Sequence, residues 1–154
     1  MRLPPRLRQA TAADAEAVSD VYLTSRKALV PWAPLAHADR DVRAWIRNHL
    51  IPTGQVTIAI QNGAVIGMMA LSDDGTVGWI DQLYLHPRAV GRGIGTTLLE
   101  HAKAELGAPI RLYTFQASAR ARRFYERHGF HVIAVGDSSD NEEQCPDVLY
   151  EWRG

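Results

Sequence analysis

Hydrophobic positions recur with a helical period over the first fifty residues. Thr11 and Asp14 form a capping-box pattern, with Asp where Glu or Gln is usual, in front of an apolar stripe that Pro31 ends. A second stripe with spacings of three and four residues follows Asp39, which can cap it, and continues to Leu50. The pattern therefore predicts two amphipathic helices near the N-terminus.

The period then changes from helical to alternating. Val56, Ile58 and Ile60 alternate with smaller or polar residues, and Asn62-Gly63 is a strong signal for a two-residue hairpin turn. The apolar residues 65–71 follow as the second strand. Residues 77–85 follow as a longer apolar strand that His86-Pro87 ends. Three consecutive antiparallel strands are expected here.

The remaining chain predicts a helix, a strand, a second helix and two further strands, in that order: residues 91–106, 110–115, 118–128, 131–135 and 148–152. A helix joins strand 77–85 to strand 110–115, so these two strands should be parallel neighbours. The expected fold is α/β (α+β), with a mixed, mostly antiparallel sheet of six or seven strands and helices on both faces. Residues 1–154 should form a single domain.

Composition excludes several classes of partner. The 17 basic and 17 acidic residues balance, which is unlike a nucleic-acid-binding protein or a polybasic membrane peptide. No apolar stretch is long enough for a membrane span or a signal peptide. Cys145 is the only cysteine, and the six histidines lack metal-ligand spacing, so neither a disulfide nor a metal site is expected. We expect a cytoplasmic protein.

A glycine-rich loop joins the strand that ends at Leu85 to the next helix. Gly91, Gly93 and Gly95 let several backbone N–H groups point at one place, where the helix dipole also favours an anion. No Gly-Lys-Ser/Thr follows, so the loop is not a Walker A motif, and Thr96 stands where a dinucleotide fingerprint has its third glycine. A phosphorylated ligand and a simple tight turn both fit the loop by itself.

This loop resembles the pyrophosphate loop of the GNAT superfamily of acyl-CoA-dependent N-acetyltransferases. That pattern is Arg or Gln, two residues, Gly, one residue, and Gly or Ala; Gly93 and Gly95 match it, whereas Val90 replaces the Arg or Gln. The resemblance implies that acetyl-CoA binds along the preceding strand and this loop, at Leu83, Tyr84, Leu85, Val90, Gly91, Arg92, Gly93, Ile94, Gly95 and Thr96.

A second segment, residues 118–130, is similar to the family pattern Asn-x-x-Ala-x-x-Phe-Tyr-x-x-x-Gly-Phe. It agrees at every position except the first, where Ser118 has a shorter reach to the cofactor than Asn. The resemblance implies that Tyr125 protonates the departing CoA thiolate, although a Phe-Tyr pair on a helix is also a common core element. Arg120 or Arg122 of the same helix could reach the nucleotide phosphates, or these arginines could simply face solvent.

The resemblance further implies a strand pair that splays apart, acetyl-CoA in the gap, and direct attack by a primary amine in a ternary complex. Asp81 could be the general base or a structural carboxylate; His86 is a second candidate base, and Cys145 a candidate acyl carrier. The acceptor, a small molecule or a peptide, should meet the first two helices, given as residues 31–50, and the loop 137–146. A non-catalytic acyl-CoA-binding module and a longer acyl donor are the alternatives, and a homodimer is compatible with the sequence.

Overall fold

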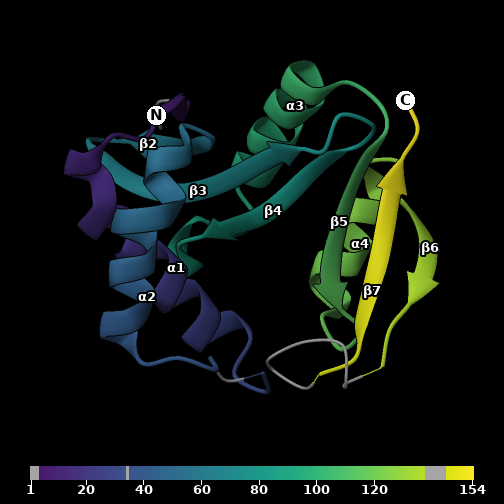
Figure 1. Ribbon diagram of the computed structural model, residues 1–154, viewed down its shortest axis with the longest axis horizontal. Coiled ribbons are helices and arrows are strands. Elements are labelled where there is room, and N and C mark those ends of the chain that lie inside the picture. Colours follow the sequence, from purple (N-terminus) through teal and green to yellow (C-terminus); the bar gives the residue numbers. More distant parts are fainter. Residues whose placement is uncertain (1–3, 34, 138–144) are drawn as a thin grey trace.

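The computed structural model describes residues 4–33, 35–137 and 145–154. Its centre is a seven-stranded sheet with the order β1-β2-β3-β4-β5-β7-β6 (Figure 1). All neighbouring strands are antiparallel except β4 and β5, which are parallel. The strands are β1 Arg6–Gln9, β2 Val56–Gln61, β3 Ala64–Asp73, β4 Gly78–Leu85, β5 Ile110–Phe115, β6 His131–Val135 and β7 Asp147–Trp152. The predicted fold class is confirmed.

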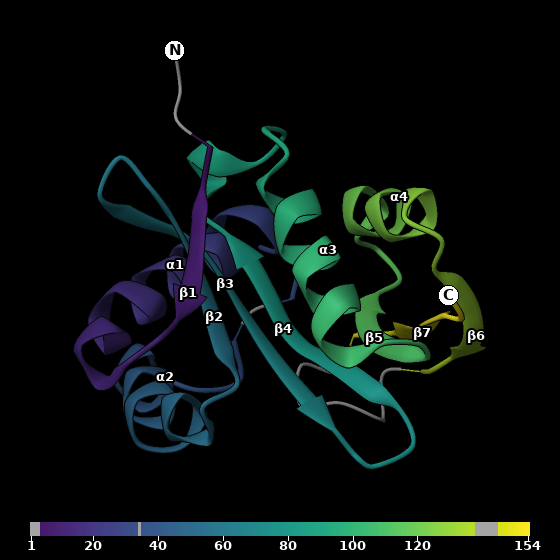
Figure 2. The ribbon, with the colours of Figure 1, turned by 90° about the horizontal axis from the view of Figure 1, so that it is seen from above.

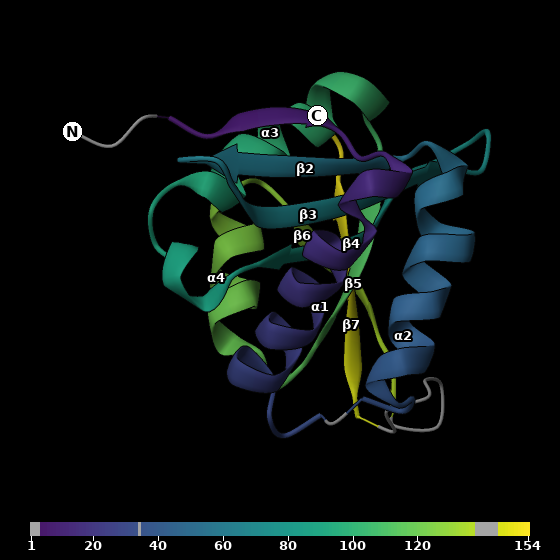
Figure 3. The same ribbon diagram turned by 90° about the vertical axis from the view of Figure 1, so that its left-hand side faces the viewer.

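In the described part of the chain, four α-helices cover the two faces of this sheet: α1 Ala15–Leu29, α2 Asp39–Trp45, α3 Ile94–Leu106 and α4 Ala119–Arg127. A π-helical turn, Ile46–Leu50, extends α2. Helices α1 and α2 lie on one face, toward the viewer in Figure 3, and α3 and α4 lie on the other (Figure 2). Each face of the sheet has its own hydrophobic core. Met69 of β3 is fully buried in the core beneath α3 and α4, and Met68 in the core beneath α1 and α2, because successive strand residues point to opposite faces. Helices therefore cover both faces of the sheet at its centre.

The parallel strands β4 and β5 stay paired only at their first residues. Gly78 aligns with Ile110 and Trp79 with Arg111, and no further pair follows. Gly78 also lets α3 pack closely on the start of β4, since a Cβ there would lie 2.9 Å from Cβ of Leu106. Beyond Trp79 the strands diverge, as Figure 1 shows, and the β5-facing edge of β4 is left without a β-sheet partner in the described chain. The predicted splayed pair is present.

Local signals at the turns and helix starts have mixed outcomes. The Asn62-Gly63 hairpin turn is confirmed, with φ values of 53° and 77°. Asp14 accepts a hydrogen bond from Thr11 N–H, although a 3-10 turn, Ala12–Asp14, precedes α1. The predicted cap at Asp39 is wrong, because Ala38 holds the N-cap position of α2. Ser118 holds the N-cap position of α4, but its side chain makes no capping hydrogen bond.

Candidate active site

A cleft of about 660 Å³ opens where β4 and β5 diverge. Its walls come from the end of α1, the outer half of β4, the glycine loop, β5 and the inner side of α4. Both sequence motifs therefore meet in one space, although they lie some 25 residues apart in the chain. The predicted site residues that line it are Asp81, Leu83, Tyr84, Leu85, Val90, Gly91, Gly93, Gly95, Thr96, Ser118 and Tyr125. Arg92 and Ile94 are not part of the lining, and the Ile94 side chain is buried in the core.

The glycine loop places the N-terminus of α3 at the cleft. Gly93 is the N-cap residue with a φ of 84°, and it offers no side chain to the first N–H groups of the helix. A Cβ at Gly93 would meet no atom within 4 Å, so the space in front of it is open to a ligand. A Cβ at Gly95 would instead lie 3.2 Å from Cζ of Phe124. The first glycine leaves room for an anion, and the second allows α3 to approach α4.

Tyr125 lies at the boundary between the cleft and the core. Its side chain packs against the rings of Phe124, Phe130 and Tyr150, and only 8% of the residue is exposed. It also lines the cleft. Burial, together with the nearby Tyr84, raises the pKa of the Tyr125 phenol above its ordinary value, so the hydroxyl carries its proton at neutral pH.

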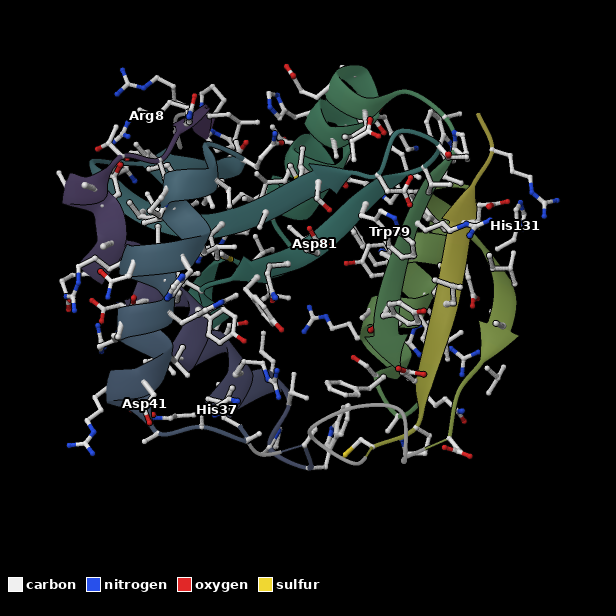
Figure 4. The ribbon with its side chains drawn as sticks, viewed as in Figure 1. Arg8, His37, Asp41, Trp79, Asp81 and His131 are labelled. Atoms are coloured by element: carbon white, nitrogen blue, oxygen red, sulfur yellow. The ribbon has the colours of Figure 1, made fainter. Side chains whose placement is uncertain are left out.

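Asp81 lies on β4 beside the diverging strands (Figure 4). The pairing of β3 and β4 shifts here, since Ala70 aligns with Gln82 and Leu71 with Ile80, so Asp81 is the extra residue of a β-bulge. Asp81 lines the cleft. Partial desolvation raises the pKa of its carboxyl group, and a hydrogen bond with Ser72 opposes that shift.

Several cleft residues were not found from the sequence. Ser25, Leu29 and Val30 bring the end of α1 to the cleft, while none of the described residues within 31–50 lines it. The helical period of α1 could have indicated this face, because Ser25 and Leu29 lie three and seven residues after the buried Tyr22. From β5 the lining includes Tyr113, Thr114 and Phe115. Residues 138–144 of the expected acceptor loop lie outside the described residues.

The two alternative reactive side chains lie outside the cleft lining. His86 accepts a hydrogen bond at Nδ1 from Arg88 N–H and caps the 3-10 turn Pro87–Ala89. The thiol of Cys145 lies 3.9 Å from the carbonyl oxygen of Trp32. Asp81 is thus the only carboxylate among the residues that line the described cleft.

The arginines of α4 separate into two groups. Arg122 turns toward the sheet, where Nε donates to the hydroxyl of Tyr150 over 3.0 Å and Nη1 donates to the carbonyl oxygen of Gln116 over 3.4 Å. Arg120, Arg123 and Arg127 line the cleft instead. Of the two arginines that the sequence offered as phosphate ligands, the structure brings only Arg120 to the cleft.

Known proteins share both the sequence pattern and the fold. The model of the acetyltransferase (GNAT) family matches residues 20–130. The chain belongs to this family. The uncharacterised N-acetyltransferase YafP of Escherichia coli (strain K12) is 28% identical over 116 residues, which cover 73% of this chain and 69% of YafP.

Two solved structures show the same GNAT fold. The PaiA N-acetyltransferase from Thermoplasma acidophilum, solved in complex with coenzyme A, superposes with a TM-score of 0.77 at 21% identity, covering 99% of this chain and 100% of that one. The apo form of YjaB from Escherichia coli superposes with a TM-score of 0.79 at 20% identity and covers 99% of both chains. These two structures match the fold, and the family assignment rests on the match over residues 20–130.

Within residues 4–33, 35–137 and 145–154, no three His, Cys, Asp or Glu side chains gather closely enough to hold a metal ion. In the same ranges no helix has the length and apolar character needed to cross a membrane.

Proposed function

We propose that this GNAT-family protein transfers the acetyl group of acetyl-CoA directly to a primary amine, on a small molecule or a peptide, in a ternary complex. The observation that carries the proposal is the cleft itself. It joins the unpaired edge of β4, the N-terminus of α3 and the hydroxyl-bearing ring of Tyr125 in one space. An acyl donor and an amine can therefore be held side by side, which removes most of the entropic cost of their encounter.

The cleft fits the chemistry of acetyl-CoA. Its pyrophosphate is an anion, and the first N–H groups of α3 beyond Gly93 form an anion site without side-chain obstruction. Its pantetheine arm contains two amide groups, which can pair with the free edge of β4 as an added strand would. The coenzyme A complex of PaiA, a protein of the same fold, supports this reading. Loss of a side-chain donor at Val90 leaves these backbone contacts available.

The residues of the cleft divide the chemistry between them. Asp81, directly or through a water, accepts a proton from the ammonium form of the acceptor, so that the nitrogen lone pair can form the new C–N bond with the thioester carbon. Backbone N–H groups of β4 near Leu83 and Leu85 stabilise the negative charge that develops on the carbonyl oxygen. As the C–S bond breaks, its electron pair leaves with sulfur, and Tyr125 donates its proton there. The nitrogen loses its second proton to water as the amide forms, and the Tyr125 phenol regains a proton from solvent.

The raised pKa of Tyr125 suits this role only because the leaving group shares its environment. An exposed thiol has a pKa near 8.5 and would be a poor proton acceptor for such a phenol. The same burial that raises the pKa of Tyr125 also raises that of a thiolate next to it, since both lose solvation of the charged form. Proton transfer between two buried neighbours is therefore less uphill than the ordinary values indicate.

The test is a thiol-release assay with acetyl-CoA against small amines, amino acids, polyamines, aminoglycosides and peptide N-termini. We expect amine-dependent CoA release, an acetylated product, and initial-rate plots that intersect, as a ternary complex requires. A Cys145→Ala variant should keep full activity, because direct transfer needs no covalent carrier. Tight CoA binding without turnover of any amine would support a non-catalytic acyl-CoA-binding module, and faster turnover of longer acyl-CoAs would reassign the donor.

A further inference from the structure

Two pairs of aromatic rings stand at one side of the cleft, and each pair joins β5 to another part of the chain. Trp79 of β4 stacks on Tyr113, with 5.9 Å between the ring centroids and 13° between the ring planes. Trp32, which follows α1, packs edge-on against Phe115 at a centroid distance of 5.5 Å. These four rings form an aromatic wall, and Tyr113 and Phe115 belong to the cleft lining.

The aromatic wall lies on the face of the sheet opposite to α3 and α4. Ile110 and Leu112 of β5 are buried in the core beneath those helices, so alternation turns Tyr113 to the other face. On that other face, Figure 1 shows no helix of the described chain in front of β5 and β7. Tyr113 is 59% exposed and Trp32 is 40% exposed. Paired aromatic rings therefore face solvent beside the cleft, where an apolar ligand would bury them.

Asp81 lies on the same face as the aromatic wall, next to Tyr113. It shares a hydrogen bond with Ser72 of β3, and Ser72 aligns with Trp79, so these side chains are on one face. The last aligned pair of β4 and β5 is Trp79 with Arg111. Asp81 and Tyr113 each lie two residues further along their strands, where the gap opens; Figure 4 shows Trp79 and Asp81 along β4. The carboxylate therefore lies beside exposed aromatic rings.

The charges at this opening suit a single ammonium group. Asp81 is the only carboxylate that lines the described cleft. Glu151, on the same face of β7, accepts hydrogen bonds from Arg111 and Arg153 over 2.8 Å and 2.6 Å. Asp147 lies outside the lining. One ammonium group is attracted by a carboxylate and by the faces of aromatic rings, whereas a second would lose its water against apolar side chains. The three arginines of α4 that line the cleft also repel a polycation.

We infer that the acceptor is a monoamine with an aromatic or bulky apolar body, which binds with its ammonium group at Asp81 and its body against Tyr113 and Phe115. The inference rests on the proposed function and names the acceptor class of that site. A free arylalkylamine and the N-terminal aromatic residue of a peptide share this chemistry. Polyamines and aminoglycosides do not, because they carry several ammonium groups.

The experiment compares kcat/KM for amines built on one four-carbon chain, at saturating acetyl-CoA. The value for 4-phenylbutylamine should exceed that for butylamine about ten- to a hundred-fold, because the added ring is buried against the aromatic wall. The value for 1,4-diaminobutane should be about ten-fold below that for butylamine, because of its second charge. Phenylalaninamide against glycinamide repeats the ring comparison on a peptide-like α-amine. The pair with the larger ring effect identifies the source of the acceptor.

Three variants locate the ring effect. Tyr113→Ala removes a largely exposed ring and should reduce the preference for 4-phenylbutylamine over butylamine about five- to ten-fold. Tyr113→Phe keeps the ring and should keep the preference. Val135→Ala removes an exposed apolar side chain of β6 outside the cleft, and it should also keep the preference. Turnover of butylamine by each variant reports that its fold is intact.

The outcomes separate this inference from the proposed function. If the parent acetylates butylamine and 4-phenylbutylamine equally well, or prefers 1,4-diaminobutane, the acceptor class is wrong while acetyl transfer stands. A ring preference that is unchanged in Tyr113→Ala also overturns the inference, because the aromatic wall is then not its cause. If no amine is acetylated, the proposed function fails and takes this inference with it.

Discussion

A Cβ on Gly95 would lie 3.2 Å from Cζ of Phe124, so α3 and α4 approach each other closely at this glycine. Any side chain at position 95 would press on the Phe124 ring. We expect Gly95→Ala to lower the free energy of unfolding by about 1–3 kcal/mol, the usual cost of an extra methyl group in a packed contact. Urea unfolding measures this change. Unaltered stability would mean that the Phe124 ring moves aside freely.

Gly93 belongs to the same motif but should respond differently. Its φ is 84° and a Cβ would meet nothing within 4 Å; Gly75, in a turn away from the cleft, has a φ of 90° and equally open space. Asparagine tolerates such backbone angles best among the other residues, so Gly93→Asn and Gly75→Asn carry matched strain.

The two asparagine variants should differ only with ligand. CoA at a hundred times its dissociation constant should add ~2.7 kcal/mol to the stability of the parent and of Gly75→Asn. Gly93→Asn should lose that gain, because its side chain occupies the approach to the α3 N-terminus. Thermal unfolding with and without CoA measures the gain. An equal rise in melting temperature for both variants would mean that the glycine loop is only a turn and does not bind CoA.

Tyr125→Phe keeps the ring contacts with Phe130 and Tyr150 but removes the proton. We expect kcat to fall by about two orders of magnitude, with little change in the affinity for acetyl-CoA. Since burial raises the pKa of this phenol, its ionisation should not produce an alkaline fall of kcat below about pH 10. Tyr113→Phe, at a 59% exposed tyrosine of the same cleft, should leave kcat unchanged. If Tyr125→Phe keeps the kcat of the parent, Tyr125 has only a packing role in the core.

The ion pair between Arg8 and Asp14 predicts a pH dependence of stability. Arg8 holds the pKa of Asp14 at about 2, below its ordinary 3.8, so the carboxylate stabilises the fold above about pH 4 and loses this effect as the pH falls toward 2. Asp14→Asn should cost about 1 kcal/mol at pH 7, because the exposed Arg8 side chain weakens the pair. Urea unfolding should show a smaller difference in the free energy of unfolding between variant and parent at pH 3. Asp41→Asn should leave the free energy of unfolding unchanged at both pH values.

The sequence predicted the elements well because each has a local cause. The Asn62-Gly63 turn and the strand 110–115 follow from turn chemistry and period alone. A local sequence pattern does not show which distant residues an element will contact in the folded chain. The bulge at Asp81 depends on the register with β3, and the inward turn of Arg122 depends on Tyr150, 28 residues away. These features belong to tertiary packing.

The roles of Asp81 and Ser72 can be separated by the pH dependence of kcat/KM. Asp81 must be ionised to act as a base, so kcat/KM rises with pH through its pKa, which desolvation raises above the ordinary value. Ser72→Ala should move this limb to higher pH, because the hydrogen bond that it removes favours the charged carboxylate. Asp81→Asn removes the base altogether.

We expect Asp81→Asn to lower kcat/KM and to shift the remaining limb toward the pKa of the acceptor itself, while acetyl-CoA binding stays intact. The size of the effect depends on the acceptor. A lysine-like amine with a pKa of ~10.4 is almost wholly protonated at pH 7, and forming its neutral amine costs roughly 4.6 kcal/mol. For an α-amino group with a pKa near 7.8 the same cost is only about 1 kcal/mol. Asp41→Asn, which removes an exposed charge on α2, should leave the profile unchanged. An Asp81→Asn profile that superimposes on that of the parent would rule out Asp81 as the base and make bulk water the proton acceptor, since His86 lies outside the cleft lining.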